Sequence, residues 1–144
     1  MEIVWGVIVI VLALPGWGGQ AISWFSPALG TRLKLMEAEE SVEPTYYADI
    51  RGEALWDTFT LWTMPVAGAL LVADSPAWPY FGIGAGAVFI YFAGRGIATR
   101  RAMQLQGFRI GKAENVTTAY VALTIWGVTG AVTLAAAAVA LSNA

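Results

Sequence analysis

Two charged residues stand inside long apolar runs of this chain, and they are the residues best placed to do chemistry. Asp57 and Arg95 each lie 19 residues from Pro76, which sits in the turn between two such runs. An antiparallel hairpin would therefore bring them to the same depth, and we predict an Asp57–Arg95 contact with Glu53 as the alternative partner. Charges inside a membrane usually pair or face a polar cavity. The pair is then either a proton or ion relay, or a staple that fixes the hairpin register while Arg95 snorkels toward lipid phosphate.

Other catalytic and metal chemistry has little support, because the chain contains no Cys and no His. Thiolate nucleophiles, Cys/His zinc sites, imidazole acid–base catalysis and His-ligated haem are thereby excluded. The glycines of "GIGAG" (82–86) lie within an apolar run and lack the strand that precedes a phosphate-binding loop. The acidic residues Glu39, Glu40 and Glu43 lack the Gly-bearing pattern of a calcium loop. We therefore expect no catalytic residue, no metal and no cofactor.

The composition indicates an integral membrane protein. The chain is 58% hydrophobic and 12% charged, with seven Trp, whereas soluble domains carry about 25% charged residues. A helix of about 20 residues spans the hydrocarbon core of a bilayer. We predict an all-α protein with four transmembrane helices, at about 3–26, 54–73, 77–98 and 117–141.

The first of these segments poses a question, because Pro15 interrupts it. Residues 3–14 would reach only about 18 Å as a helix, whereas residues 3–26 would reach about 36 Å. Pro15 therefore either ends a half-span or kinks a full one, and we predict a kinked full span. A signal peptide fits poorly, since the first residues carry no Lys or Arg. Pro65 predicts a second kink in the second span.

The basic residues predict which side each loop occupies. All eight Lys and Arg fall between the first and second segments or at the end of the third segment and after it. Short basic loops stay in the cytoplasm. We thus expect a single transmembrane domain (1–144) with two cytoplasmic loops (31–53 and 99–116), both termini on the non-cytoplasmic side, and a location in the cytoplasmic (inner) membrane.

The two prolines also predict a groove, because both fall near the bilayer midplane. Proline frees a backbone carbonyl, and many transporters build substrate sites from broken helices at this depth. The residues of this candidate groove are Pro15, Gly19, Gln20, Thr63 and Pro65. The alternative is simple kinking, with neighbouring threonines bonding the freed carbonyls. Most of the tryptophans could wall such a groove or anchor the helices at the interface.

Two further sets of residues suggest contacts with helices and with lipid. Small residues allow helices to approach closely, and the candidates for helix packing are Gly82, Gly86, Gly127 and Ala131. The basic last loop offers lipid phosphate contacts from Arg100, Arg101, Arg109 and Lys112. Alternatively this loop docks on the first loop, which carries three basic and six acidic residues.

These patterns favour a non-enzymatic accessory or scaffold subunit that packs in the bilayer as a homo-oligomer or within a larger membrane complex. We expect no nucleic-acid partner. The alternative is a small channel or carrier for a neutral solute or apolar ligand, using the kinked helices. A third class, a membrane enzyme acting on lipid, would need Asp57 or loop carboxylates together with Arg95, Arg100 and Arg101 on a phosphate.

Overall fold

The computed structural model describes residues 2–143, which form helices and connecting turns without strands. Four helical segments are long and apolar enough to cross a membrane, as the sequence predicted. The elements are α1 (Glu2–Phe25), α2 (Pro27–Arg32), the short 3-10 helix η1 (Glu39–Ser41), α3 (Pro44–Thr60), α4 (Thr63–Val72), α5 (Trp78–Leu105) and α6 (Ala113–Ser142).

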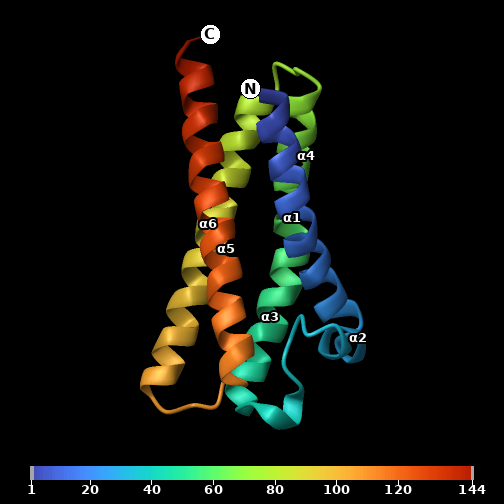
Figure 1. Cartoon of the computed structure of the whole chain (residues 1–144), viewed down its shortest axis with the longest axis vertical. Coiled ribbons are helices and arrows are strands. Elements are labelled where there is room, and N and C mark those ends of the chain that lie inside the picture. The colour runs from blue at the N-terminus through green and yellow to red at the C-terminus, as the bar shows by residue number, and fades with distance from the viewer. Residues whose placement is uncertain (1, 144) are drawn as a thin grey trace.

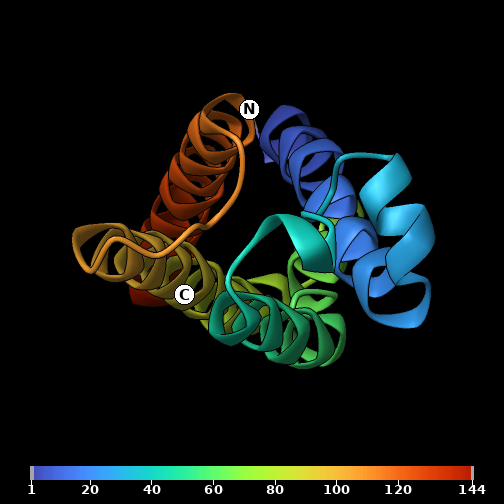
Figure 2. The same cartoon turned by 90° about the horizontal axis from the view of Figure 1, so that it is seen from below.

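The long helices stand side by side in an up-and-down bundle (Figure 1). The start of α1, the end of α6 and the turn between α4 and α5 lie at one end of the bundle, which we call the terminal end. The segments 33–43 and 106–112 lie at the opposite end, which we call the loop end. Seen from the loop end, α1, α3, α5 and α6 surround the bundle axis, with α2 on the outside of α1 (Figure 2).

The helices extend further toward the loop end than the apolar runs indicated. The second span begins at Pro44 and the third continues to Leu105, while the fourth begins at Ala113. Pro44 suits the first turn of a helix because its missing N–H would have no partner there. The polar residues of these added turns thus sit on rigid helices, which matters for the positions of Asp49, Glu53 and Arg100.

Pro15 does not end the first helix. It lies inside α1, which continues for 24 residues to Phe25, so the half-span alternative is wrong. The bend at Pro15 stays a prediction. The second span is interrupted at Leu61 and Trp62, between α3 and α4.

The carbonyls around this interruption are bonded within the protein. Proline removes the N–H that would bond the carbonyl of Leu61, and the Met64 N–H bonds it instead at 3.2 Å. Side chains bond the three carbonyls before it: Trp17 Nε1 donates to Thr58 O, Trp62 Nε1 to Phe59 O and Thr63 Oγ1 to Thr60 O, at 2.8–2.9 Å. The simple-kink alternative expected neighbouring threonines in this role, but Thr63 alone acts in this way; a backbone N–H and two tryptophans, one of them from α1, make the other bonds. These carbonyls are therefore not left free for a substrate.

Small residues bring the helices together in two pairs. A Cβ on Gly86 of α5 would lie 2.7 Å from the Gly130 carbonyl oxygen of α6. Likewise, a Cβ on Gly6 of α1 would lie 2.8 Å from the Gly68 carbonyl oxygen of α4. The backbones at these points approach too closely for any side chain, which is why glycine is required. Packing between α3 and α5 is sparse by comparison.

The two loops dock on each other at the loop end, as one of the sequence alternatives proposed. The Glu43 N–H donates to the Arg109 carbonyl at 2.8 Å, and Asn115 Nδ2 donates to Glu37 Oε1 at 2.7 Å. A small apolar cluster lies beneath these bonds and consists of Val42, Tyr46, Ile50, Ile110 and Val116. The loops therefore fix the spacing of α3, α5 and α6 at this end.

Candidate ligand-binding cavity

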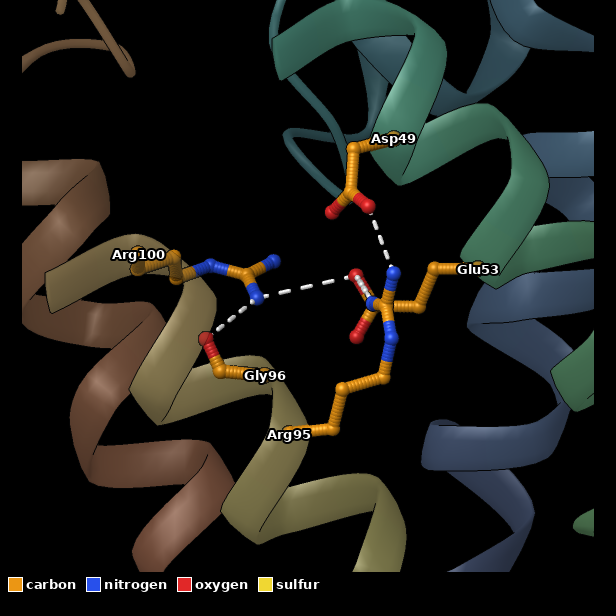
Figure 3. Close-up of polar contacts among 5 residues, drawn as sticks. All are labelled: Asp49, Glu53, Arg95, Gly96 and Arg100. Atoms are coloured by element: carbon orange, nitrogen blue, oxygen red, sulfur yellow. Dashed lines mark hydrogen bonds and ion pairs between the residues drawn. The ribbon is translucent and has the colours of Figure 1, made fainter. Parts of the chain in front are cut away.

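Four charged residues from α3 and α5 meet near the loop end, and we call them the ion cluster: Asp49, Glu53, Arg95 and Arg100 (Figure 3). Arg95 Nη2 lies 2.5 Å from Asp49 Oδ1, and its Nη1 lies 3.5 Å from Glu53 Oε2. Arg100 Nη1 lies 3.6 Å from the same Glu53 oxygen and donates to the Gly96 carbonyl at 3.0 Å. Glu53 is thus held between two guanidinium groups while its side chain is only 4% exposed.

The predicted direct Asp57–Arg95 contact is wrong, and the alternative partner Glu53 takes its place. Arg95 extends toward the loop end (Figure 3), where two carboxylates meet it. The equal spacing from Pro76 predicts only that the backbones of Asp57 and Arg95 lie at the same depth. The long arginine side chain carries its guanidinium group away from that depth, to Asp49 and Glu53. Asp49 was missed as a partner because the helix was expected to become apolar only at residue 54. Asp49 lies one turn before Glu53 in α3, so the same face carries both.

Asp57 is buried beside this cluster without belonging to it. It is 5% exposed, and its Oδ2 has no hydrogen-bond partner among the described residues. A small cavity of about 220 Å³ lies here, lined by Asp57, Glu53, Arg95 and Tyr91 among others. We call it the side cavity.

A larger cavity of about 470 Å³ lies between α1, α3, α5 and α6. We call it the loop-end cavity. Its volume is in the range of small-molecule sites in proteins, about 300–1,000 Å³. One part of its wall is apolar: Pro15, Phe92, Leu123 and Trp126. Another part is polar: Gln20, Glu37, Glu53, Arg100 and Asn115.

Three of the five predicted groove residues line this cavity. Pro15, Gly19 and Gln20 belong to the wall from α1, whereas Thr63 and Pro65 lie on the interrupted second span and are absent from the wall. The prediction was wrong for these two because the cavity is lined by α1, α3, α5, α6 and the loops before α3 and α6, and no residue of α4 reaches it. Trp126 of α6 donates from Nε1 to the Leu12 carbonyl of α1 at 2.8 Å. The tryptophans were expected as possible walls of a groove, and among the described residues Trp126 is the one tryptophan that lines the loop-end cavity.

Two polar atoms of the cavity wall have no hydrogen-bond partner among residues 2–143. They are Glu53 Oε1, an acceptor, and Arg100 Nε, a donor, and both are buried. Buried polar atoms are bonded in most proteins, and each exception needs an explanation. Both residues line the loop-end cavity, but these two atoms are closed to solvent, so a ligand in the cavity does not reach them without a shift of the side chains.

The predicted packing residues serve contacts within the chain, with one exception. Gly82 and Gly86 of α5 face α6, where their added Cβ atoms would lie 2.8 Å from Ala137 and 2.7 Å from Leu134. Gly127 faces Ala93 of α5, and its added Cβ would lie 3.0 Å away. Ala131 is exposed on the outer side of α6. Most of this small-residue surface is therefore used by the fold itself.

Of the four predicted lipid contacts, three are exposed and the fourth, Arg100, is not. Arg101, Arg109 and Lys112 are exposed, and Arg109 Nε also lies 3.4 Å from Glu43 Oε1. Arg100 turns inward, with its side chain 14% exposed and its guanidinium over the Tyr46 ring. Its prediction as a lipid contact is therefore wrong, because a buried carboxylate and a carbonyl bind it instead.

Comparison with protein-family models, with curated proteins and with solved structures found no match for this chain. What the loop-end cavity could bind must therefore be judged from the chemistry of its own wall.

Proposed function

We propose that this chain is a small, non-enzymatic, multi-pass membrane protein that binds a neutral or apolar ligand in the loop-end cavity, as a carrier or binding subunit does. The observation that carries the proposal is the cavity itself, about 470 Å³ with apolar and polar residues in its wall. Ligand sites in proteins have this make-up, mostly apolar with a few placed polar groups.

Our proposed orientation places the loop end in the cytoplasm and both termini outside, in the cytoplasmic (inner) membrane. The distribution of Lys and Arg supports it, since the turn 74–78 carries none of them while the loop end carries many. Bends at Pro15 and Pro65 belong to the same proposal. The cavity would then open toward the cytoplasm, with its apolar part within the bilayer.

A lipid-modifying enzyme has less support. Such an enzyme would need arginines free to bind phosphate, but Arg95 and Arg100 both pair with carboxylates inside the protein. Arg101 is exposed and is absent from the walls of both cavities described above.

Filling the cavity tests the proposal. Gly19 lines the cavity, and a Cβ there would meet only Leu35, at 3.7 Å, so Gly19→Leu would place its side chain in or beside the cavity without forcing the backbone apart. Gly18→Leu is the matched control, since Gly18 lies outside the wall and an added Cβ meets nothing within 4 Å. We expect a brominated apolar probe to quench Trp126 in the native chain and in Gly18→Leu, and to do so far less in Gly19→Leu. Equal quenching in all three would contradict the proposal.

A role as an accessory or scaffold subunit is the second candidate. It is favoured by exposed small residues on the outer face of α6: Ala131, Ala135 and Ala138. Helices associate in membranes through such surfaces. We expect Ala131→Leu to weaken any homo-oligomer or larger complex obtained by native purification, as measured by light scattering or native mass spectrometry. A monomer in mild detergent, without co-purifying subunits, would count against this candidate.

A further inference from the structure

We infer that the loop-end cavity holds the hydrocarbon chain of a phospholipid, taken from the leaflet at the loop end of the bundle. The inference rests on the proposed function and adds the chemical class and the source of the ligand. It is carried by the length of the cavity along the helices, by the separation of α1 and α6, by the exposure of the wall within the spans, and by the order of apolar and polar residues.

The cavity is about as long as half a bilayer is thick. Its wall on α1 runs from Pro15 to Ser23, and its wall on α6 runs from Glu114 to Trp126. At about 1.5 Å per residue, these stretches measure about 12 Å and about 18 Å. The hydrocarbon core of a bilayer is about 30 Å thick, so one leaflet contributes about 15 Å. Because Pro15 and Trp126 lie near the middle of their helices, the chain of a lipid in one leaflet matches this length.

Helices α1 and α6 are joined at that deep end. Trp126 Nε1 donates to the Leu12 carbonyl at 2.8 Å, and a Cβ on Gly16 would lie 3.1 Å from the Trp126 ring. Packing between the two helices is sparse compared with that between α5 and α6, and their loop-end halves stand apart (Figures 1 and 2). The cavity lies between these halves, and α3 and α5 add to its wall.

The wall of the cavity continues onto the outer surface of the bundle. Pro15 of α1 and Thr118 of α6 line the cavity and are exposed, while Gly19, which also lines it, is half-buried. Pro15 and Thr118 lie within the expected spans 3–26 and 117–141, so the surface at this depth faces lipid. A hydrocarbon chain can therefore enter sideways between α1 and α6.

The wall changes from apolar to polar toward the loop end. The deep part consists of apolar residues: Pro15, Phe92, Leu123 and Trp126. The part nearer the loops carries charged and amide side chains: Lys34, Glu37, Glu114 and Asn115. A phospholipid has the same order, with its chains in the core of the bilayer and its head group at the surface. Since both signs of charge occur at this end, the chain rather than the head group is recognised.

The source of the chain follows from the direction of the opening. Phospholipids surround a membrane-spanning helix at far higher concentration than a dissolved solute, and occupancy rises with the ratio of ligand concentration to Kd. A phospholipid chain is therefore favoured over a small apolar molecule that arrives from the aqueous side.

Quenching of Trp126 by brominated phospholipid tests the inference. The protein is placed in nanodiscs of phosphatidylcholine that carries bromine on one acyl chain, and the signal is the quenching that disappears in Trp126→Phe. Gly19→Leu fills the cavity, whereas Gly18→Leu adds the same side chain outside its wall. We expect quenching in the native chain and in Gly18→Leu, and its loss in Gly19→Leu. Quenching from the outer surface of the bundle would be equal in all three and would overturn the inference.

A second pair of variants repeats the comparison from α6, so the test survives if Gly19→Leu does not fold. Ala119 lines the cavity and is half-buried, whereas Val121 is exposed and lies outside the wall. Ala119→Leu should lose the quenching and Val121→Leu should keep it. Native mass spectrometry gives an independent measure: the native chain and Val121→Leu should retain one phospholipid more than Ala119→Leu. Equal retention in the three chains would contradict the inference.

Bromohexane in nanodiscs of unbrominated lipid separates this inference from the proposed function. If bromohexane quenches Trp126 in the native chain but not in Gly19→Leu, while brominated phospholipid shows no such difference, the proposed function holds and the phospholipid inference is overturned. If neither probe distinguishes the two chains, both fail. A difference with brominated phospholipid supports both, whatever bromohexane does.

Discussion

Arg95 of α5 reaches Asp49 of α3, with Nη2 and Oδ1 2.5 Å apart, although Asp57 lies on the same helix at the depth expected from the hairpin. The same guanidinium also lies 3.5 Å from Glu53. Since packing between α3 and α5 is sparse, polar contacts supply much of the connection between these helices. The staple thus joins Arg95 to Glu53, the alternative partner, and to Asp49, which was not predicted, and Asp57 lies beside it without an ion-pair partner among the described residues.

Removing Arg95 should therefore destabilise the bundle, whereas removing the charge of Asp57 should not. Arg95→Gln leaves Asp49 without its ion pair and Glu53 with Arg100 alone. We expect a loss of about 1–3 kcal/mol in the free energy of unfolding. Asp57→Asn removes a negative charge near Glu53 and should not lower the melting temperature. Thermal unfolding of both variants in one detergent, followed by circular dichroism, checks this. A drop for Asp57→Asn equal to that for Arg95→Gln would show that Asp57 takes part in the staple.

The close approach of α5 and α6 predicts a sharp difference between two neighbouring glycines. A Cβ on Gly86 would lie 2.7 Å from the Gly130 carbonyl oxygen and 2.9 Å from the Leu134 nitrogen, which are backbone atoms that cannot turn away. We expect Gly86→Ala to cost about 1–3 kcal/mol by forcing the helices apart. At Gly84 an added Cβ meets nothing within 4 Å.

Gly84→Ala is thus the matched control, and it should be neutral or stabilise the helix by up to about 1 kcal/mol. The melting temperatures of the two variants give the comparison. If Gly86→Ala left stability unchanged but altered the oligomeric state, the glycine would serve contact between subunits instead.

The four long helices were predictable because long apolar runs are a strong signal of membrane-spanning helices. The length of the first run also predicted that α1 continues past Pro15. The cavity was only partly predictable. Pro15, Gly19 and Gln20 were expected at such a site, but Tyr46 and Asn115 line it because α3 and α6 begin earlier than the apolar runs do. Arg100 was assigned to lipid, since no pattern in the sequence shows which way a charged side chain turns at the end of a helix. The contact of Trp126 with Leu12, 114 residues apart in sequence, depends on tertiary packing alone.

The exposed basic residues of the last loop should bind anionic lipid. Arg101, Arg109 and Lys112 face outward, and each basic residue near an anionic surface contributes about 1 kcal/mol. Replacing all three with Gln should weaken the binding of phosphatidylglycerol about tenfold or more. Native mass spectrometry of the delipidated protein, titrated with this lipid, measures it. Arg100→Gln should have little effect, because Arg100 is bound inside the protein; an equal loss there would mean that it reaches lipid after all.

The proposed orientation predicts a pattern of labelling at three positions. The start of α1 and the turn between α4 and α5 lie at the same end of the bundle (Figure 1), and residues 106–112 lie at the other. The chain has no Cys, so single Cys variants report one position each. A membrane-impermeant maleimide added to intact cells should label Glu2→Cys and Pro76→Cys, while Gln106→Cys should react only after permeabilisation. The reverse pattern at all three positions would keep four spans but invert the protein. Labelling of Glu2→Cys and Pro76→Cys from opposite sides would contradict the four-span arrangement itself, because two helical crossings separate these positions.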